Sequence, residues 1–164
     1  MPPAGNQARA CVLVAVDRET AFRVFTEEID GWWRRGLKYR ALGQGRGIIH
    51  LEPKPAGRLY ESFDTPAGPQ VFETGRVLSW EPPARLLLEW RGVNFAPDEK
   101  TEVEVLFEPS ASGTLVTVTH RGWSAIGRDH PVRHGQDVAG FLRRIGLWWG
   151  ELLSSLREQL ARPS

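Results

Sequence analysis

The chain has 164 residues and a formal net charge of +1, from 21 basic and 20 acidic residues. Charges so closely balanced predict no general attraction to nucleic acid or to anionic membranes. The single cysteine, Cys11, excludes an internal disulfide, and no apolar run approaches the roughly 20 residues of a membrane span. We therefore expect a soluble, cytoplasmic protein without membrane insertion, in which one domain (residues 10–162) follows a disordered N-terminal segment (residues 1–9).

An apolar run over residues 10–16 predicts a first strand. Asp17 is placed to cap a helix over residues 18–28, which we expect to end at Asp30-Gly31. Further strands are predicted over residues 48–52, 57–63, 70–80, 85–91, 101–107 and 114–120, separated by short turns. Gly75 is expected to mark a bulge or bend. Short connections between neighbouring strands favour an antiparallel meander.

The last third of the chain is amphipathic over residues 135–161. Apolar residues recur there at steps of three and four, namely Val138, Phe141, Leu142, Ile145, Trp148, Trp149, Leu152, Leu156 and Leu160. Such spacing predicts a long helix with one buried stripe. The fold class is therefore α+β, with a curved antiparallel sheet of about six or seven strands wrapped around a long C-terminal helix, and one or two short helices after the first strand.

Several features occur in a fixed order along the chain. They include the doublet Trp32-Trp33, the turn Pro82-Pro83-Ala84-Arg85-Leu86 leading to Trp90, and Thr101-Glu102-Val103. This order resembles the START-like (SRPBCC, helix-grip) superfamily, in the branch similar to the C-terminal domain of the Aha-type activator of the Hsp-90 chaperone ATPase. The resemblance covers roughly residues 10–160. It implies a ligand-binding cavity rather than a particular reaction. Ala56 stands where this family often has a glycine, which leaves the local turn in question.

Strand alternation indicates which side chains face such a cavity. We predict a mainly apolar pocket between the sheet and the C-terminal helix, lined by Trp32, Trp33, Phe63, Leu88, Trp90, Val103, Val105, Phe107, Val118, His120, Phe141, Ile145, Trp148 and Trp149. The alternative is a core filled by the same side chains. Of the tryptophan doublet, one ring is expected in the core and the other at the pocket mouth.

His120 is the titratable residue that best fits this pocket. It could bind a ligand or act as a general base, or it could be a buried histidine bonded to a backbone carbonyl. If the protein is an enzyme, Tyr60 and Glu61 are the further acid–base candidates. The chain has no paired carboxylates at a defined spacing, no nucleophile elbow and no Cys–His arrangement, so a covalent mechanism has no support.

His130 and His134 lie four residues apart, with Asp129 and Asp137 nearby. Without a second cluster at fixed spacing, this is a weak zinc signal, and we interpret these residues as solvated. No metal and no cofactor is expected.

Three functions remain open at this point. The first is binding of a small hydrophobic or aromatic molecule without covalent chemistry. The others are a cyclase- or hydrolase-type enzyme that uses the same cavity, and a chaperone-associated interaction module. The oligomeric state is left open, with a homodimer as one possibility.

Overall fold

The structure is a computed structural model that describes residues 7–36, 38–40, 47–91, 95, 98–123 and 138–161. Its elements in chain order are β1 (Gln7–Val14), α1 (Arg18–Glu27), α2 (Ile29–Trp32), β2 (Ile48–Leu51), β3 (Arg58–Thr65), β4 (Gly68–Glu81), β5 (Arg85–Trp90), β6 (Thr101–Ser110), β7 (Gly113–Arg121) and α3 (Val138–Ala161). The strands form one antiparallel sheet in the order β1-β7-β6-β5-β4-β3-β2. The α+β helix-grip prediction is therefore confirmed.

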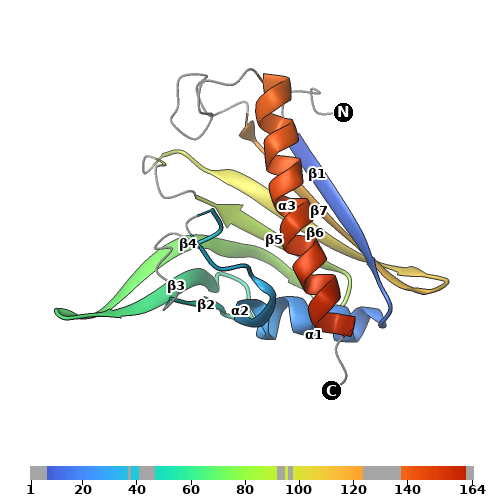
Figure 1. The fold of residues 1–164 in the computed structure, drawn as a ribbon, viewed down its shortest axis with the longest axis horizontal. Coiled ribbons are helices and arrows are strands. Elements are labelled where there is room, and N and C mark those ends of the chain that lie inside the picture. Colours follow the sequence, from blue (N-terminus) through green and yellow to red (C-terminus); the bar gives the residue numbers. More distant parts are fainter. Residues whose placement is uncertain are drawn as a thin grey trace.

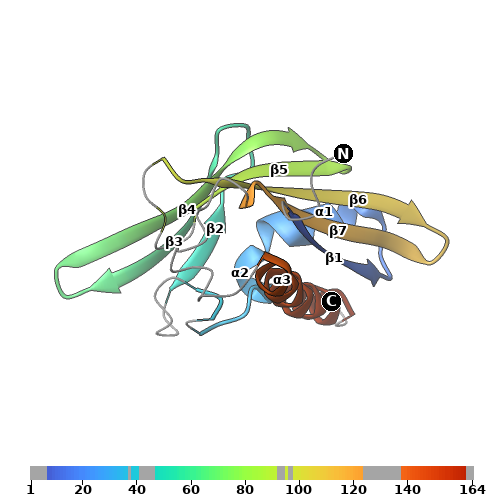
Figure 2. The same cartoon turned by 90° about the horizontal axis from the view of Figure 1, so that it is seen from above.

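The sheet curls around α3, which lies across its concave side and beside β1 (Figures 1 and 2). The segment that carries α1 and α2 joins the two edge strands, β1 and β2, and closes one end of the sheet. β1 begins at Gln7, three residues before the expected start. Of the predicted terminal helix, residues 135–137 lie outside the described residues. No helix in the described part of the chain has the length and apolar character needed to cross a bilayer.

Asp17 caps α1 as predicted, because its Oδ1 accepts a hydrogen bond from the Thr20 amide at 2.8 Å. The expected break at Asp30-Gly31 is wrong, since both residues lie inside α2. The apolar residues of this short turn, Ile29 and Trp32, are 3% and 1% exposed. Their burial in the core outweighs the low helix propensity of aspartate and glycine.

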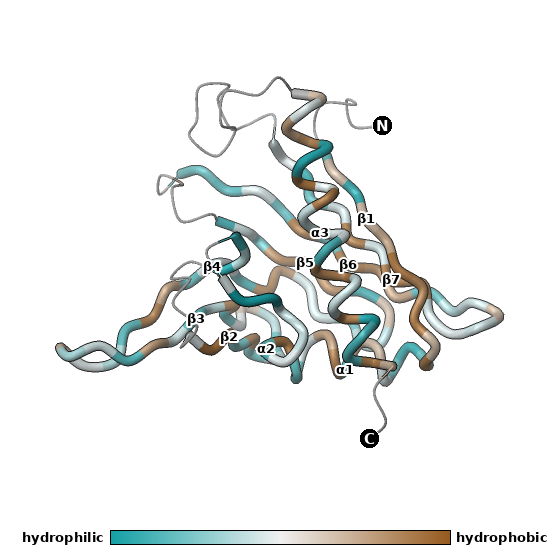
Figure 3. The backbone as a smooth tube through the Cα atoms, in the orientation of Figure 1, coloured by the Kyte–Doolittle hydropathy of each residue, from teal (hydrophilic) through white to brown (hydrophobic). Residues whose placement is uncertain are grey.

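The predicted alternation along β5 and β6 is confirmed. Leu86 and Leu88 are buried, whereas Arg85 lies on the opposite face and pairs with Glu104 at 2.8 Å. Hydrophobic and hydrophilic residues alternate along the tube in the same way (Figure 3). The apolar side chains of the concave face therefore form the core together with α1 and α3.

Two backbone irregularities shape β3 and the approach to it. The register between β3 and β4 shifts after Leu59, which leaves Thr74 unpaired beside Gly75 and confirms the expected bulge. A Cβ at Gly75 would collide with the main-chain oxygen of Glu89, so the close approach requires glycine. Ala56 has a φ of 63°, in the left-handed region that glycine adopts freely.

The buried stripe of α3 follows the predicted spacing with one addition, whereas the predicted members Ile145, Trp148 and Leu160 are only partly buried. Its buried residues are Phe141, Leu142, Trp149, Leu152, Leu153 and Leu156. Leu153 was not in the predicted stripe, so the buried stripe is wider than the three- and four-residue steps alone indicate. Burial of each leucine stabilises the packing by about 1.5–3 kcal/mol.

Candidate functional site

A group of rings meets between α3 and the concave face of the sheet. We call it the aromatic cluster, and it comprises Trp33, Trp90, His120, Trp123, Trp148 and Trp149. The centroids of its contacting rings are between 4.5 and 6.3 Å apart, mostly in edge-to-face geometry. Such pairs are worth about 0.5–1.5 kcal/mol each beyond their buried area. The structure thus brings five of the predicted pocket residues together with Trp123.

His120 lies in this cluster with both ring nitrogens bonded. The Trp149 indole N–H donates to Nδ1 at 3.1 Å. Because an indole nitrogen can only donate, Nδ1 must carry the lone pair, and the proton of the neutral ring sits on Nε2. Nε2 donates to the Thr101 hydroxyl at 2.7 Å, which in turn donates to the Trp90 carbonyl oxygen at 3.3 Å.

Burial controls the charge state of this histidine. Its surroundings are apolar rings, and desolvation lowers the pKa of His120 from 6.5 to about 3. The neutral ring therefore persists across the physiological range. Its Nδ1 lone pair already accepts from Trp149, so acid–base work would require this bond to open. The arrangement resembles the expected buried histidine, except that its partners are an indole and a hydroxyl rather than a backbone carbonyl.

Three further indole N–H groups at the sheet–helix interface are hydrogen-bonded. Those of Trp32, Trp33 and Trp148 donate to the carbonyl oxygens of Phe25, Tyr39 and Lys38, at 3.1, 2.9 and 2.6 Å. Both rings of the doublet are buried, at 1% and 5% exposed, whereas one was expected at the pocket mouth. These tryptophans therefore present carbon surface rather than free hydrogen-bond donors.

Most of the remaining predicted lining residues are buried in the sheet–helix core, namely Leu88, Val103, Val105, Val118 and Phe141. Phe107 instead packs against Phe22 and Phe25 of α1. Phe63 lies on the β3–β4 hairpin, opposite Gln70. The structure does not bring these two phenylalanines together with the aromatic cluster.

The three acid–base candidates are separated in space. Tyr60 stacks on His50 and lies under the Arg58 guanidinium, on the face of β3 that points away from Glu61. Glu61 is buried on the inner side. Four strand spacings separate β3 from β7, which carries His120, or roughly 19 Å along the sheet. No shared site for these groups follows from this geometry.

Three apolar residues of the inner stripe of α3 remain partly exposed, namely Ile145 and Trp148 near its middle and Leu160 near its end. Ile145 and Trp148 are half-buried, although Phe141, Trp149 and Leu152 on the same stripe are buried. The Trp148 ring stacks on Tyr39, with centroids 6.0 Å apart and an interplanar angle of 28°. Accessible apolar surface therefore lies between α3 and the segment that follows α2.

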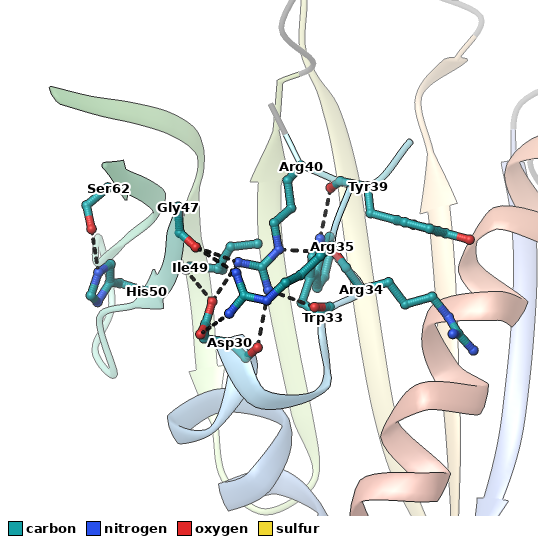
Figure 4. Close-up of polar contacts among 10 residues, drawn as sticks. All are labelled: Asp30, Trp33, Arg34, Arg35, Tyr39, Arg40, Gly47, Ile49, His50 and Ser62. Atoms are coloured by element: carbon teal, nitrogen blue, oxygen red, sulfur yellow. Dashed lines mark hydrogen bonds and ion pairs between the residues drawn. The ribbon is translucent and has the colours of Figure 1, made fainter. Parts of the chain in front are cut away.

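A buried arginine organises this segment (Figure 4). The Arg40 guanidinium donates to Asp30 Oδ1 at 2.7 Å and to the main-chain oxygens of Asp30, Trp33, Arg34 and Gly47 at 2.7 to 3.2 Å. Partial burial raises the pKa of the Asp30 carboxyl, but bonds from the Ile49 amide and from Arg40 outweigh burial and lower it overall. Sequence reasoning missed this network, because nothing in the spacing of these residues signals it.

Among the described residues, no three His, Cys, Asp or Glu side chains come close enough to hold a metal ion. The residues of the weak zinc signal, Asp129, His130, His134 and Asp137, lie outside the described residues.

The curled antiparallel sheet grips a long C-terminal helix, and the core lies between the two. This architecture defines a helix-grip protein. Within that class the assignment is specific. The family model of activator of Hsp90 ATPase homolog 1-like proteins matches residues 15–158, and the chain belongs to this family. The predicted resemblance is confirmed.

Solved structures with the same fold include a protein from Nitrosomonas europaea, with 18% identity and a TM-score of 0.62 over 97% of this chain and 96% of that one. The Aha1 dimer from Colwellia psychrerythraea has 16% identity and a TM-score of 0.61 over 94% and 95%. DynU16, described as a putative protein in the dynemicin biosynthetic locus, has 18% identity and a TM-score of 0.63 over 97% of this chain and 48% of that one. At these identities the likeness shows the fold alone. A search of curated proteins found no match.

Proposed function

We propose that this domain binds a small hydrophobic or aromatic molecule between the sheet and α3, without covalent chemistry. The observation that carries the proposal is the partial exposure of Ile145 and Trp148 on the inner stripe of the helix. Apolar side chains at such positions are normally covered, and a guest molecule would cover them. The ligand gains free energy from the apolar area that it removes from water.

Two features of the aromatic cluster support this position and an apolar guest. Trp90 and Trp149 already contact each other, with centroids 5.6 Å apart, so the guest rests against Ile145 and Trp148 rather than between these deeper rings. The Trp148 indole N–H is bonded to the Lys38 carbonyl oxygen. Recognition at Trp148 therefore depends on apolar and ring contacts, which favours an apolar or aromatic guest over a polar one.

The test combines native mass spectrometry of the purified protein with a thermal-shift screen of lipids and aromatic acids. Ile145→Trp fills the space beside Trp148, and we expect it to reduce both the co-purified mass and the thermal shift. Leu147→Trp adds the same ring to the outer side of the same helix, where Leu147 is 66% exposed, and should change neither. If no compound stabilises the native protein and no mass accompanies it, the proposal is wrong.

The family assignment favours a second candidate, an interaction module that acts on a chaperone ATPase. Its support is the match to activator of Hsp90 ATPase homolog 1-like proteins over residues 15–158. Stimulation of an Hsp90-type ATPase by the purified domain would support this candidate. An apolar ligand bound without any effect on the ATPase would favour the first.

A further inference from the structure

An open depression of about 510 Å³ lies between α2 and the C-terminal half of α3, and it is lined in part by Trp33, Arg34, Arg35 and Ser155. Figure 4 shows Arg34 reaching from the segment after α2 toward α3. The main-chain oxygens of Trp33 and Arg34 are both bonded to Arg40. The backbone beneath the depression is therefore fixed, and the side chains start from fixed positions.

Arg34 is held in place by one end of its guanidinium group. Its Nε donates to the main-chain oxygen of Glu151 on α3 at 2.8 Å. Neither of its Nη atoms bonds to another residue in the part of the chain that the structure describes. Ser155 follows Glu151 by one helical turn, so both residues lie on the same side of α3. Arg34 and Ser155 thus border the same open space.

Two carboxylates lie near the depression, and both are engaged by cations. Asp30 is engaged by Arg40 at 2.7 Å and by Arg35 at 3.4 Å, and Glu151 is engaged by Lys38 at 2.8 Å. The Lys38 bond also lowers the pKa of the Glu151 carboxyl, so this carboxylate stays ionised and paired. Both carboxylates are therefore engaged by cations other than Arg34, whose guanidinium group also interacts electrostatically with the Glu151 carboxylate.

We propose that this depression is a binding site for an oxyanion, either a phosphate or a carboxylate group. The planar fork of an arginine matches two oxygen atoms of such a group, and charge-assisted bonds of this kind are about twice as strong as neutral ones. The Ser155 hydroxyl supplies a third donor. Asp30 also lines the depression, but both of its carboxylate oxygens are engaged, because Oδ1 accepts from Arg40 and from the Ile49 amide and Oδ2 pairs with Arg35 at 3.4 Å. Trp33 and Tyr39 line the depression and also contact Trp148, so the oxyanion site adjoins the apolar surface proposed above.

The experiment is a titration followed by NMR, with inorganic phosphate and acetate as separate probes at pH 7 and at constant ionic strength set by sodium chloride. We expect saturable shifts of the Arg34 Nε–H and Gly31 amide signals. A response to phosphate alone assigns the site to phosphate groups, and a response to both extends it to carboxylates. Shifts that never saturate, or that chloride reproduces, would overturn the proposal.

Three variants make the test specific. Arg34→Gln should weaken binding by about ten-fold or more, because it removes the charge and the fork. Ser155→Ala deletes a hydroxyl that bonds to no described residue, so it keeps the fold intact and should weaken binding several-fold. Arg23→Gln is the matched control, since Arg23 pairs with Glu28 on α1, and it should bind as the native protein does. Equal binding by all three variants would contradict the assignment.

Discussion

The buried, neutral His120 makes the stability of this protein depend on pH. In the unfolded chain its pKa is the ordinary 6.5, and in the folded protein burial lowers it to about 3. Between these two values the unfolded state binds more protons than the folded state, so the free energy of unfolding falls as the pH falls. The contribution of His120 is fully present above pH 6.5 and is lost as the pH drops toward 3.

The size of the effect follows from the shift. Each pH unit below 6.5 costs about 1.4 kcal/mol, so the loss between pH 7 and pH 5 is about 2 kcal/mol. We expect urea denaturation, followed by tryptophan fluorescence at pH 7, 6 and 5, to show this decrease. In His120→Gln the decrease should disappear. The variant should also be about 1–3 kcal/mol less stable at pH 7, because the Trp149 N–H loses its acceptor.

The comparison of the native protein with His120→Gln isolates the contribution of the His120 side chain. Carboxyls with lowered pKa values, such as that of Asp30, contribute equally to both proteins and cancel in the difference. His50→Gln is the matched control. His50 bonds to Ser62 away from the cluster, and this variant should keep the full decrease because His120 is still present. Equal slopes in the native protein and in His120→Gln would refute the reasoning.

Two further predictions concern stability. Leu156→Ala should lower the free energy of unfolding by about 2–5 kcal/mol, because Leu156 is fully buried. Leu147→Ala, on the exposed side of α3, should change it by less than about 0.5 kcal/mol. Similar losses for the two variants in urea denaturation would contradict the placement of α3. Ala56→Gly should raise the free energy of unfolding by about 0.5–1 kcal/mol. Relief of the backbone strain at a φ of 63° outweighs the added entropy of the unfolded chain. A clear decrease in the same assay would show that this turn is unstrained.

The strands and the terminal helix could be predicted because their apolar residues repeat with the period of the element. Thr101, Val103 and Val105 alternate with charged residues, and all three are buried. Such patterns follow directly from the geometry of a strand or a helix. The helical turn at Asp30-Gly31 could not be predicted, because it depends on tertiary burial rather than on local propensity.

The candidate site was predicted only in part. The sequence indicates that His120 faces inward, but its partners belong to α3 and to β6, and their approach depends on how the helix crosses the sheet. The depression near Arg34 was missed entirely. Its main anchors are main-chain oxygens, such as that of Glu151. The pattern of residue types does not reveal where main-chain atoms of distant segments meet.

The planar group of Arg40 reaches five acceptors, of which two belong to Asp30 on α2 and three lie on the segment between α2 and β2. A lysine ammonium carries three N–H groups on a single nitrogen and could not span them. Alignments that score arginine and lysine as equivalent would therefore misjudge this position. A homologue with lysine here must secure its connection by other means, and its surface beside α3 should not be assumed to have the same shape.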